Sequence, residues 1–537
     1  MELAQIEQTE SKNAVAADEE AVATPATDST MNDMAPTLPP AAPRVALVDG
    51  CRVVGLSEED EAFYSTFTAV QRRRVRLKTD LRLLPVLCIL YLFAQLDRTN
   101  IANAKIEGFK EDTHLTDKQY NIVLAIFFVP YCLLEVPSNM LLKNLQRPSL
   151  YISFLVCAWG IVMTCHGAAQ SFAGVLSLRL LLGIFESGFF PAAMYICSQW
   201  YQRHELAFRL SLFMAVASLS GAFSSFLAAG IAKLGGVGGV EPWRWIFLLE
   251  GAATVVLGVM TLFFLVDSPR RSGKWLEPGE IRYLEIMNFI KDGGRTEASS
   301  APSKLQDLKS VALDWRYWAF GLVLHNVGAC GYGLKFAVPS IIRGMGYSRT
   351  HSQLMSAIPY IFGTISAVGV SFASDMTAKR SLFMAGGLGS IAVGFAIILA
   401  VVNTLEDKTE GVVAGMCFVT CGVFPMAPIS GSWVSNNFGT SGRRAVGLAF
   451  VMGIGSLGGL TGSFMYDEGD SPRFHLAFGL SLGFATMGLL LVAGLVFSYW
   501  RANRKRDQMV EADIRAKYTE TQLVEMGDKS PLFRYML

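Results

Sequence analysis

Oppositely charged residues interrupt two of the long apolar stretches in this 537-residue chain. Asp97 and Arg98 are adjacent near the end of the first stretch, and Arg179 and Glu186 share a later one. A charge within a membrane-length apolar segment is costly unless it faces a cavity or a partner, so it marks a functional site. A buried carboxyl group can take up and release a proton, and a guanidinium group binds carboxylates through paired hydrogen bonds. The pattern predicts a buried site that handles protons and a small anion.

The spacing of these residues indicates which of them can meet on a helix. Neighbouring helical residues point about 100° apart, so Asp97 and Arg98 do not simply pair with each other, and at least one should face an interior. In the alternative, both lie at the mouth of the helix and reach the lipid headgroups. Arg179 and Glu186 fall on one helix face, about 10 Å apart along the axis, with Gly183 between them. They are either open to a mobile proton or anion, or held in a static buried ion pair.

Two further acidic residues lie in apolar stretches. Glu135 follows Tyr131, a predicted substrate-binding residue, and is either a second protonatable group or a structural cap near the cytosolic end. Glu250 follows Trp243 and Trp245, which are typical of a membrane-interface belt. We interpret Glu250 as a structural partner of another helix.

Polar residues in the second half of the chain are candidate substrate ligands. Asn326, Tyr332 and Lys335 share one stretch. Lys335 either binds a substrate carboxylate or reaches outward to the membrane surface. Asn436 and Asn437 end a later stretch, where their amides either hydrogen-bond the substrate or cap the helix.

Motifs of soluble enzymes are not supported by their context. Gly453-Ile-Gly455-Ser-Leu-Gly458 matches a dinucleotide-binding fingerprint, but it lies within an apolar stretch and follows no strand. Close helix packing through glycine is the better interpretation. The nine cysteines form no CxxC pair and show no metal-ligand spacing. We therefore predict no enzyme activity, no metal site and no cofactor, and we expect energy to come from a gradient.

The composition is that of a membrane protein. Hydrophobic residues make up 52% of the chain and charged residues 17%, below the roughly 25% of a soluble domain. These values exclude a disordered chain and an ordinary soluble enzyme. Lysine plus arginine number 46 against 45 aspartate plus glutamate, so no basic excess suggests nucleic acid. The expected partner is the lipid bilayer.

Twelve apolar stretches are long enough to cross a bilayer as helices, which takes about 20 residues. The first six cover residues 83–103, 120–141, 150–168, 174–199, 209–233 and 244–266. The second six cover residues 316–342, 353–373, 381–402, 411–433, 443–465 and 474–500. They are unbroken rather than alternating, which excludes a β-barrel. The predicted fold is an all-α membrane protein with twelve transmembrane helices in two six-helix bundles.

The remaining segments set the predicted domain boundaries. The predicted parts are a disordered cytosolic tail (1–75), a six-helix bundle (76–267), a cytosolic central loop (268–314), a second six-helix bundle (315–500) and a cytosolic tail (501–537). Within the loop, Trp275 to Lys291 should form a short amphipathic surface helix, and residues 293–303 a polar linker. Lysine and arginine gather in the loops of one side, which must be cytosolic, so both termini should lie inside.

With these features the sequence resembles the major facilitator superfamily. The six-plus-six layout is one basis, and the helix with Arg179 and Glu186 is another. Ser374-Asp375 followed by Lys379-Arg380 looks like the superfamily's gating-loop motif. The counterpart of this motif in the first half, Lys143 to Arg147, lacks the usual aspartate.

More narrowly, four segments are similar to the anion:cation symporter family, in particular its fungal allantoate permease-like branch. They are Leu96 to Ile101, Trp243 to Gly251, Ser432 to Asn437 and Arg443 to Ala445. The resemblance covers about residues 75–505. Members carry small organic anions such as ureides, nicotinate and other vitamins or carboxylates, usually with protons.

The resemblance also implies roles for the charged residues. Asp97 and Glu186 would be the proton sites, and Arg98 would hold the substrate carboxylate. Arg179, a further candidate for substrate binding, would pair with Glu186 until protonation releases it. Lys335 suggests a second anionic group on the substrate. The two bundles would rock around a site near the middle of the membrane, exposing it to each side in turn.

The function expected from the sequence is therefore secondary transport. The chain would act as a monomer in the plasma membrane and move a small organic anion by proton symport. An exporter of a small fungal metabolite on the same fold is the first alternative. A nutrient sensor that binds without transporting is the second.

Overall fold

A computed structural model of the chain describes residues 45–48, 51–54, 56–143, 145, 147–291, 304–377, 379–402, 409–438, 441–471, 473–519, 522–523 and 526–537. Helices dominate this part of the chain. Its strands are β1 (Val45–Val48) and β2 (Cys51–Val54), which pair as an antiparallel hairpin. The predicted polar linker at 293–303 and residues 1–44 of the predicted N-terminal tail lie outside the described residues.

The first half of the chain forms six long helical spans, two of them in two pieces. They are α3 (Ala69–Ile106), α5 with α6 (Asp117–Ile126 and Phe128–Lys143), α7 (Pro148–His166), α8 with α9 (Phe172–Glu186 and Phe189–Trp200), α10 (Arg203–Ile231) and α11 (Pro242–Phe264). The shorter helices of this half are α2 (Glu58–Thr66), α4 (Phe109–Asp112) and the 3-10 turns η1 (Ala232–Leu234) and η2 (Val237–Gly239).

The second half repeats this arrangement. Its spans are α14 (Trp315–Gly344), α15 (Arg349–Thr377), α16 (Arg380–Val401), α17 with α18 (Thr409–Val423 and Met426–Asn437), α19 with α20 (Ser441–Ser456 and Gly458–Met465) and α21 (His475–Asp507). Between the halves lie η3 (Pro269–Arg271), α12 (Pro278–Lys291) and α13 (Lys304–Ala312). The later short elements are η5 (Glu468–Asp470), α22 (Glu511–Lys517) and η6 (Gly527–Lys529).

The predicted fold class is confirmed. Within the described residues, 10 helical segments are long and apolar enough to cross a membrane. The other two predicted spans are occupied by α5 with α6 and by α14. The 30 residues of α14 reach about 45 Å at 1.5 Å per residue, which is more than enough to cross a bilayer. Its lower hydropathy reflects polar residues such as Asn326 and Lys335.

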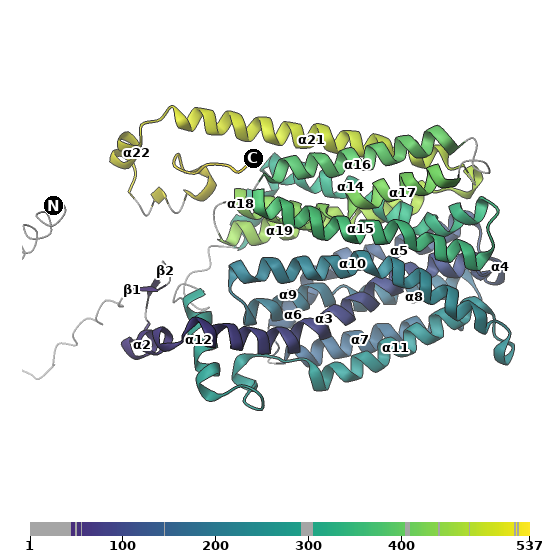
Figure 1. Ribbon diagram of the computed structural model, residues 1–537, viewed down its shortest axis with the longest axis horizontal. Helices are drawn as coiled ribbons and strands as arrows, with labels where there is room; N and C mark the ends of the chain where they lie inside the picture. Colours follow the sequence, from purple (N-terminus) through teal and green to yellow (C-terminus); the bar gives the residue numbers. More distant parts are fainter. Residues whose placement is uncertain are drawn as a thin grey trace, which may run out of the picture. The chain divides into compact units, whose positions relative to one another are not determined.

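The spans run in alternating directions, which gives the two bundles two distinct ends. Helices α3, α7, α10, α14, α16 and α19 begin at the same end as α21 finishes, with Arg504, Lys505 and Arg506 in its last turn. We call this the basic end and the other the opposite end. In Figure 1 the basic end is on the left, near α2, α12 and α22, and α4 marks the opposite end.

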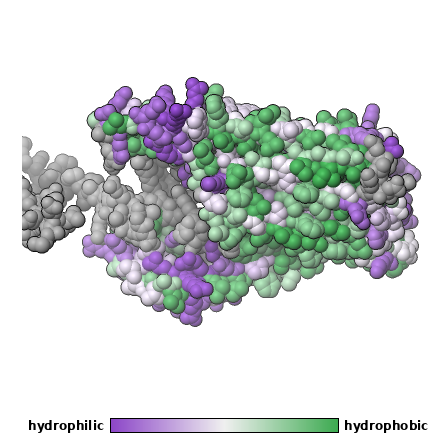
Figure 2. Space-filling view, turned by 45° about the horizontal axis from the view of Figure 1, so that its top comes forward, coloured by the Kyte–Doolittle hydropathy of each residue, from purple (hydrophilic) through white to green (hydrophobic). Residues whose placement is uncertain are grey.

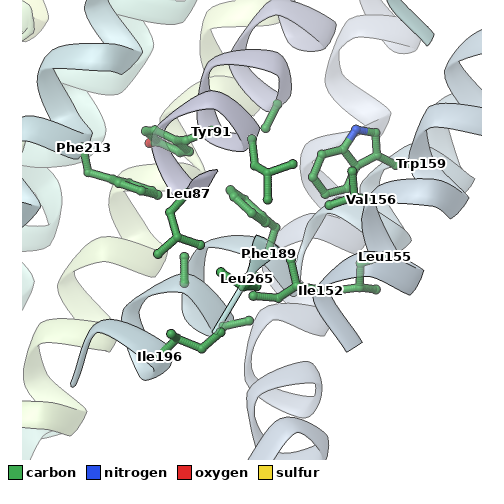
Figure 3. Close-up of a cluster of buried hydrophobic side chains, with 14 of the residues drawn as sticks. Leu87, Tyr91, Ile152, Leu155, Val156, Trp159, Phe189, Ile196, Phe213 and Leu265 are labelled. Carbon is green, nitrogen blue, oxygen red and sulfur yellow. The ribbon is translucent and has the colours of Figure 1, made fainter. Parts of the chain in front are cut away.

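Each half has its own hydrophobic core. The core of the first half runs from Leu56 to Ile290, and Phe336 joins it from the second half, with the partly buried Tyr332 and Leu460 packed against it. Figure 3 shows part of it, where the Tyr91 ring stacks on Phe213 with centroids 4.6 Å apart and Trp159 meets Phe189 edge-on at 5.4 Å. The core of the second half joins residues from Val311 to Tyr535.

The outer faces of the helices are apolar. Phe263 and Leu490 are exposed over 79% and 74% of their surface, and Ile365 and Phe372 are each exposed over 66%. Figure 2 shows a largely hydrophobic band between more hydrophilic ends on one face of the molecule. A continuous exposed apolar band of this extent indicates contact with lipid.

The predicted disordered tail extends too far along the chain. The prediction is wrong for residues 58–75, which form α2 and the start of α3. The Tyr64 ring of α2 stacks on Tyr283 of α12 at 5.3 Å, and Arg282 binds Asp60 at 2.8 Å. The Arg282 guanidinium lowers the pKa of the Asp60 carboxyl. The composition of residues 58–75 did not indicate an ordered segment. Their order depends on contacts with α12, which lies more than 200 positions away in the sequence.

Candidate functional site

A cavity of about 250 Å³ lies between the two halves. Tyr91, Gln95 and Arg98 line it from α3, and Tyr332 and Lys335 line it from α14. The three residues of α3 are spaced by four and three positions, so they share one helix face. Both halves therefore contribute charged and aromatic side chains to one space.

Four spans are interrupted where they approach the cavity. The breaks fall at Phe127 between α5 and α6, at Ser187-Gly188 between α8 and α9, at Phe424-Pro425 between α17 and α18, and at Leu457 between α19 and α20. Phe424 itself lines the cavity. Interrupted helices near the membrane centre are typical of substrate sites in carriers, because irregular backbone is tolerated where it borders a cavity.

Arg98 and Glu186 form a buried ion pair at the cavity wall. The Arg98 Nε and Nη2 atoms lie 2.6 and 2.5 Å from Glu186 Oε1, and the two side chains are 7% and 1% exposed. Arg98 Nη1 also donates to the Tyr332 hydroxyl at 3.3 Å. The guanidinium carbon lies 4.6 Å from the Tyr131 ring centroid and 5.3 Å from that of Phe127. The structure thus brings together four residues that the sequence analysis singled out. Three come from spans of the first half and one from the second half: Arg98, Tyr131, Glu186 and Tyr332.

Lys335 is the second cation of the cavity. Its ammonium group is buried and donates to Gln95 Oε1 at 3.4 Å. Among the described residues, no carboxylate forms an ion pair with it. Gln95 was not predicted as a site residue, although its spacing from Arg98 was a signal. An ammonium group with one long hydrogen bond to a neutral amide is available to a ligand.

Glu135 also lines the cavity, one turn beyond Tyr131 on α6 and closer to the basic end. Its role as a protonatable group stays a prediction. The same holds for the gating residues at the turn from α15 to α16. There Arg380 binds Asp375 at 2.5 Å and Ser374 at 3.0 Å, while Lys379 is exposed. The first-half counterpart, Lys143 to Arg147, lies partly outside the described residues.

The expected pairing of Arg179 with Glu186 is not seen in this structure, and its role in substrate binding stays a prediction. Arg179 is 2% exposed but does not line the cavity, and within the described residues no ion pair joins it to Glu186. Arg98 has taken that carboxylate instead. The Arg179 Nε and Nη2 atoms have no hydrogen-bond partner among these residues. Arg179 is thus a buried cation inside the first bundle, close enough to Asp97 and Glu186 to interact with them electrostatically.

Asp97 points away from the cavity, into the first bundle. Its Oδ2 atom accepts hydrogen bonds from Trp159 Nε1 at 3.2 Å and from Thr254 Oγ1 at 3.4 Å. The Asn100 amide donates to Asp97 Oδ1 at 3.5 Å and to Glu250 Oε2 at 2.7 Å. Arg98 thus faces the cavity and Asp97 the bundle interior, as their different helix directions allow.

Three predicted substrate ligands in the second half lie elsewhere. Asn326 donates to the backbone oxygen of Phe484 at 3.2 Å, between α14 and α21. Asn437 exchanges hydrogen bonds with the backbone of Met536 at 2.7 and 3.0 Å, and Asn436 contacts the Met536 sulfur. Asn326, Asn436 and Asn437 are not among the residues that line the cavity, so their role as substrate ligands stays a prediction without support from this structure. Asn436 and Asn437 instead bind Met536 of the C-terminal segment, at the basic end.

The glycine motif between residues 453 and 458 packs helices, as interpreted from the sequence. A Cβ atom on Gly458 would lie 2.4 Å from the backbone oxygen of His325. A Cβ atom on Gly328 of α14 would lie 2.7 Å from the backbone oxygen of Gly455. The packing interpretation is confirmed, because these glycines let the backbones of α14 and α19–α20 touch.

The two halves meet closely at the opposite end. Gln353 of α15 donates to Glu107, at the end of α3, at 2.8 Å, and Arg349 lies 3.9 Å from the same carboxylate. Deeper in, the Phe128 ring meets Tyr332 edge-on at 5.0 Å. These contacts join the two halves at the opposite end, while Glu135 extends the cavity lining toward the basic end.

Comparison with known proteins agrees with this architecture. The family model described as Major Facilitator Superfamily matches residues 87–463. The chain is 34% identical to the MFS-type transporter cnsO of Penicillium expansum over 482 residues, 88% of this chain and 92% of that protein. It is 27% identical to the high-affinity nicotinic acid transporter of Saccharomyces cerevisiae, over 90% of this chain and 88% of that protein.

A solved structure shares the fold. It is an inward-facing, occupied form of a bacterial homolog of the human lysosomal transporter Spinster. It is 17% identical, with a TM-score of 0.55, and the match covers 77% of this chain and 93% of that chain. The helix layout, the shared cavity and the extent of these matches lead to one conclusion. The chain belongs to the Major Facilitator Superfamily, and it is a multi-pass membrane transporter rather than an enzyme.

Proposed function

We propose that the protein is a proton symporter that imports a small organic anion of the carboxylate, vitamin or ureide kind. The observation that carries the proposal is the Arg98–Glu186 ion pair at the cavity wall. A guanidinium group is suited to grip a carboxylate through forked hydrogen bonds, and Glu186 already occupies this one. Substrate must therefore displace Glu186. A proton on Glu186 makes that displacement cheap, since no buried charge is left unpaired.

The charges around the cavity support coupling of one proton to one anion. Arg98 and Lys335 are balanced by Glu135 and by Glu186, so the empty site is close to neutral when all four are charged. A proton on one acid leaves one net positive charge, which a monoanion neutralises. Closing the cavity then encloses no net charge. A second proton would add the membrane potential, worth about 2.3 kcal/mol per 100 mV.

The cavity walls support a compact, flat substrate. Tyr91, Tyr131, Phe190, Tyr360 and Phe424 all line it. Its volume of about 250 Å³ equals roughly eight water molecules at about 30 Å³ each. A single ring bearing a carboxylate fits these features, and the relative named as a nicotinic acid transporter supports the same choice.

The proposal places the protein in the plasma membrane as a monomer with both termini in the cytosol. The cavity is built within one chain, so no second copy is needed to complete it. The basic last turn of α21 supports the orientation, since lysine and arginine favour the cytosolic side. The cavity of this structure would then open toward the cytosol.

The test is uptake in cells that express the protein. Labelled nicotinate, allantoate and pantothenate are offered in acidic and in neutral medium, with and without an uncoupler that collapses the proton gradient. The proposal predicts acid-stimulated, uncoupler-sensitive accumulation of at least one acid compared with cells carrying Arg98→Ala. Loss of preloaded substrate, driven by the gradient and without acid-stimulated uptake, would indicate an exporter and overturn the proposal.

A further inference from the structure

Two carboxyl groups lie side by side in the first bundle, outside the substrate cavity. Asp97 of α3 and Glu250 of α11 are 0% and 2% exposed. The side-chain amide of Asn100 donates to both, at 3.5 and 2.7 Å. An amide nitrogen carries two hydrogens, so one group can serve both carboxyls at once. We refer to Asp97 and Glu250 as the carboxyl pair.

The carboxyl pair lacks the charge compensation that two ionised acids need. Within the described residues, no lysine or arginine forms an ion pair with either member. Glu250 Oε1 and Asn100 Oδ1 are buried acceptors with no hydrogen-bond partner there. Two ionised carboxylates so close together, away from water, repel each other strongly. A proton held by the pair removes that repulsion and supplies a donor for one of the unpartnered oxygens.

The other titratable groups around the pair are few. From α8, Glu186 and Arg179 lie within electrostatic range of Asp97. From α7, His166 stacks on Phe247 of α11 at 5.5 Å, with its Nδ1 atom bonded to the Val162 backbone oxygen at 2.9 Å. From α10, the neutral Ser224 hydroxyl accepts a hydrogen bond from Asn103 of α3 at 2.7 Å.

We infer that Glu250 is a further proton-coupling residue, which shares one exchangeable proton with Asp97 at a site separate from the substrate cavity. This inference rests on the proposed proton symport and adds to it a second proton position. When the pair releases its proton, Arg179 is the nearby cation with unused Nε and Nη2 donors. Arg98 follows Asp97 directly on α3, so a change of charge on the pair is felt at the Arg98–Glu186 ion pair.

A purely structural role for Glu250 makes a different prediction. Glu250→Gln keeps the shape of the side chain and an oxygen that can accept from Asn100, but it cannot exchange a proton. A structural role would leave proton binding and the pH profile of transport unchanged in this variant. The coupling role requires both to change.

Infrared difference spectroscopy of the purified full-length protein tests proton binding without substrate. Spectra taken in mildly acidic and mildly alkaline buffer should differ by the carbonyl stretch of a protonated carboxylic acid. Asp97→Asn and Glu250→Gln should each remove or shift the same component. Glu241→Gln, at the exposed start of α11, should leave it intact. An unchanged component in Glu250→Gln, or loss only in Asp97→Asn, would overturn the inference.

Transport provides the second readout. Removing one carboxyl relieves the repulsion on the other, so the remaining acid binds its proton only at lower pH. Glu250→Gln should lower the pH of half-maximal uptake by about one unit, the scale on which two sites count as coupled. Glu250→Asp should restore part of the shift. A wild-type profile in Glu250→Gln would overturn the inference. If the wild type shows no acid-stimulated uptake at all, the proposed function fails instead, and the infrared result still decides whether the pair binds a proton.

Discussion

The Arg98 guanidinium lies 2.5 Å from the Glu186 carboxylate, although the two residues are 88 positions apart in the chain. The pair joins α3 to α8 at the wall of the cavity. In this pair, the guanidinium of Arg98, which is suited to bind an anion, is bound to the carboxylate of Glu186, which is suited to bind a proton. In the proposed symport, the proton would release Arg98 and the anion would replace Glu186 on it, and this exchange would couple the two ligands.

Arg98 should dominate substrate affinity. Arg98→Ala is expected to raise the KM for uptake about 10- to 100-fold, the equivalent of about 1.5–3 kcal/mol for hydrogen bonds to a charged group. The KM of Arg98→Lys should lie between those of Arg98→Ala and the wild type, because lysine keeps the charge but loses the forked geometry. Arg270→Ala is the matched control, since Arg270 is 83% exposed and lies outside the cavity. An unchanged KM in Arg98→Ala would contradict the assignment.

Lys335 should determine which anions are preferred. Lys335→Met keeps the apolar stem and removes the charge that faces the cavity beside Gln95. The KM for an acid with a second anionic group should rise about tenfold, close to the value of one charge-assisted hydrogen bond. The KM for a simple monocarboxylate should change much less. Competition of unlabelled mono- and dicarboxylates for uptake measures both, and equal effects on the two classes would rule out the selective role.

The fold followed closely from the sequence because the membrane imposes it. Apolar stretches of bilayer length must be helices, since no water satisfies exposed backbone groups in lipid. All predicted spans have a helical counterpart. The first span carries Arg98 and the fourth carries Glu186. These two side chains can therefore share one buried site if the two spans are neighbours. The order of residues 58–75 escaped prediction because it depends on α12, whose contact with α2 leaves no trace in local composition.

The site was harder to predict because partner choice is a tertiary property. The sequence pointed to Arg179 as the partner of Glu186 and to Arg98 as a substrate ligand, and only the packing shows that Arg98 pairs with Glu186. Asn437 looked like a substrate ligand because an amide at a helix end is polar, yet Met536 from the far end of the chain binds it. Glu250 was interpreted as structural, and its position beside Asp97 became visible only in three dimensions.

Acid should favour closure of the opposite end. Burial raises the pKa of the Glu107 carboxyl, while Arg349, Arg343 and the hydrogen bond from Gln353 act in the other direction. An acid with a raised pKa is protonated more readily in the closed arrangement. Closure is therefore fully favoured below the ordinary value of about 4.3 and weakens as the pH rises through the raised value.

Spin labels at Glu111 and His351 would report this closure, since both residues are exposed and lie on different halves at that end. In a cysteine-free background, the distance between the labels should lengthen as the pH rises. Glu107→Gln should reduce that change, and Glu241→Gln should preserve it. A pH response that survives Glu107→Gln in full would show that this carboxyl does not control the gate.

Gly459 should limit how tightly the halves can close. A Cβ atom at this position would lie 2.3 Å from the Phe128 ring across the interface between the halves. Gly459→Ala should disfavour the present arrangement by about 1–3 kcal/mol, the usual cost of overpacking. The same label pair should then report a larger open population. Gly453→Ala is the control, because a Cβ atom there meets nothing within 4 Å. Similar distances in the two variants would contradict the steric argument.

Glu186→Gln tests the central claim most directly. The variant cannot carry a proton at this position, but its cavity still contains Arg98. In proteoliposomes it should exchange labelled for unlabelled substrate across the membrane, while losing accumulation driven by a proton gradient. Proton entry on addition of substrate, followed with a trapped pH dye, should be lost in parallel. Gradient-driven accumulation and proton entry at the wild-type level in Glu186→Gln would contradict the account.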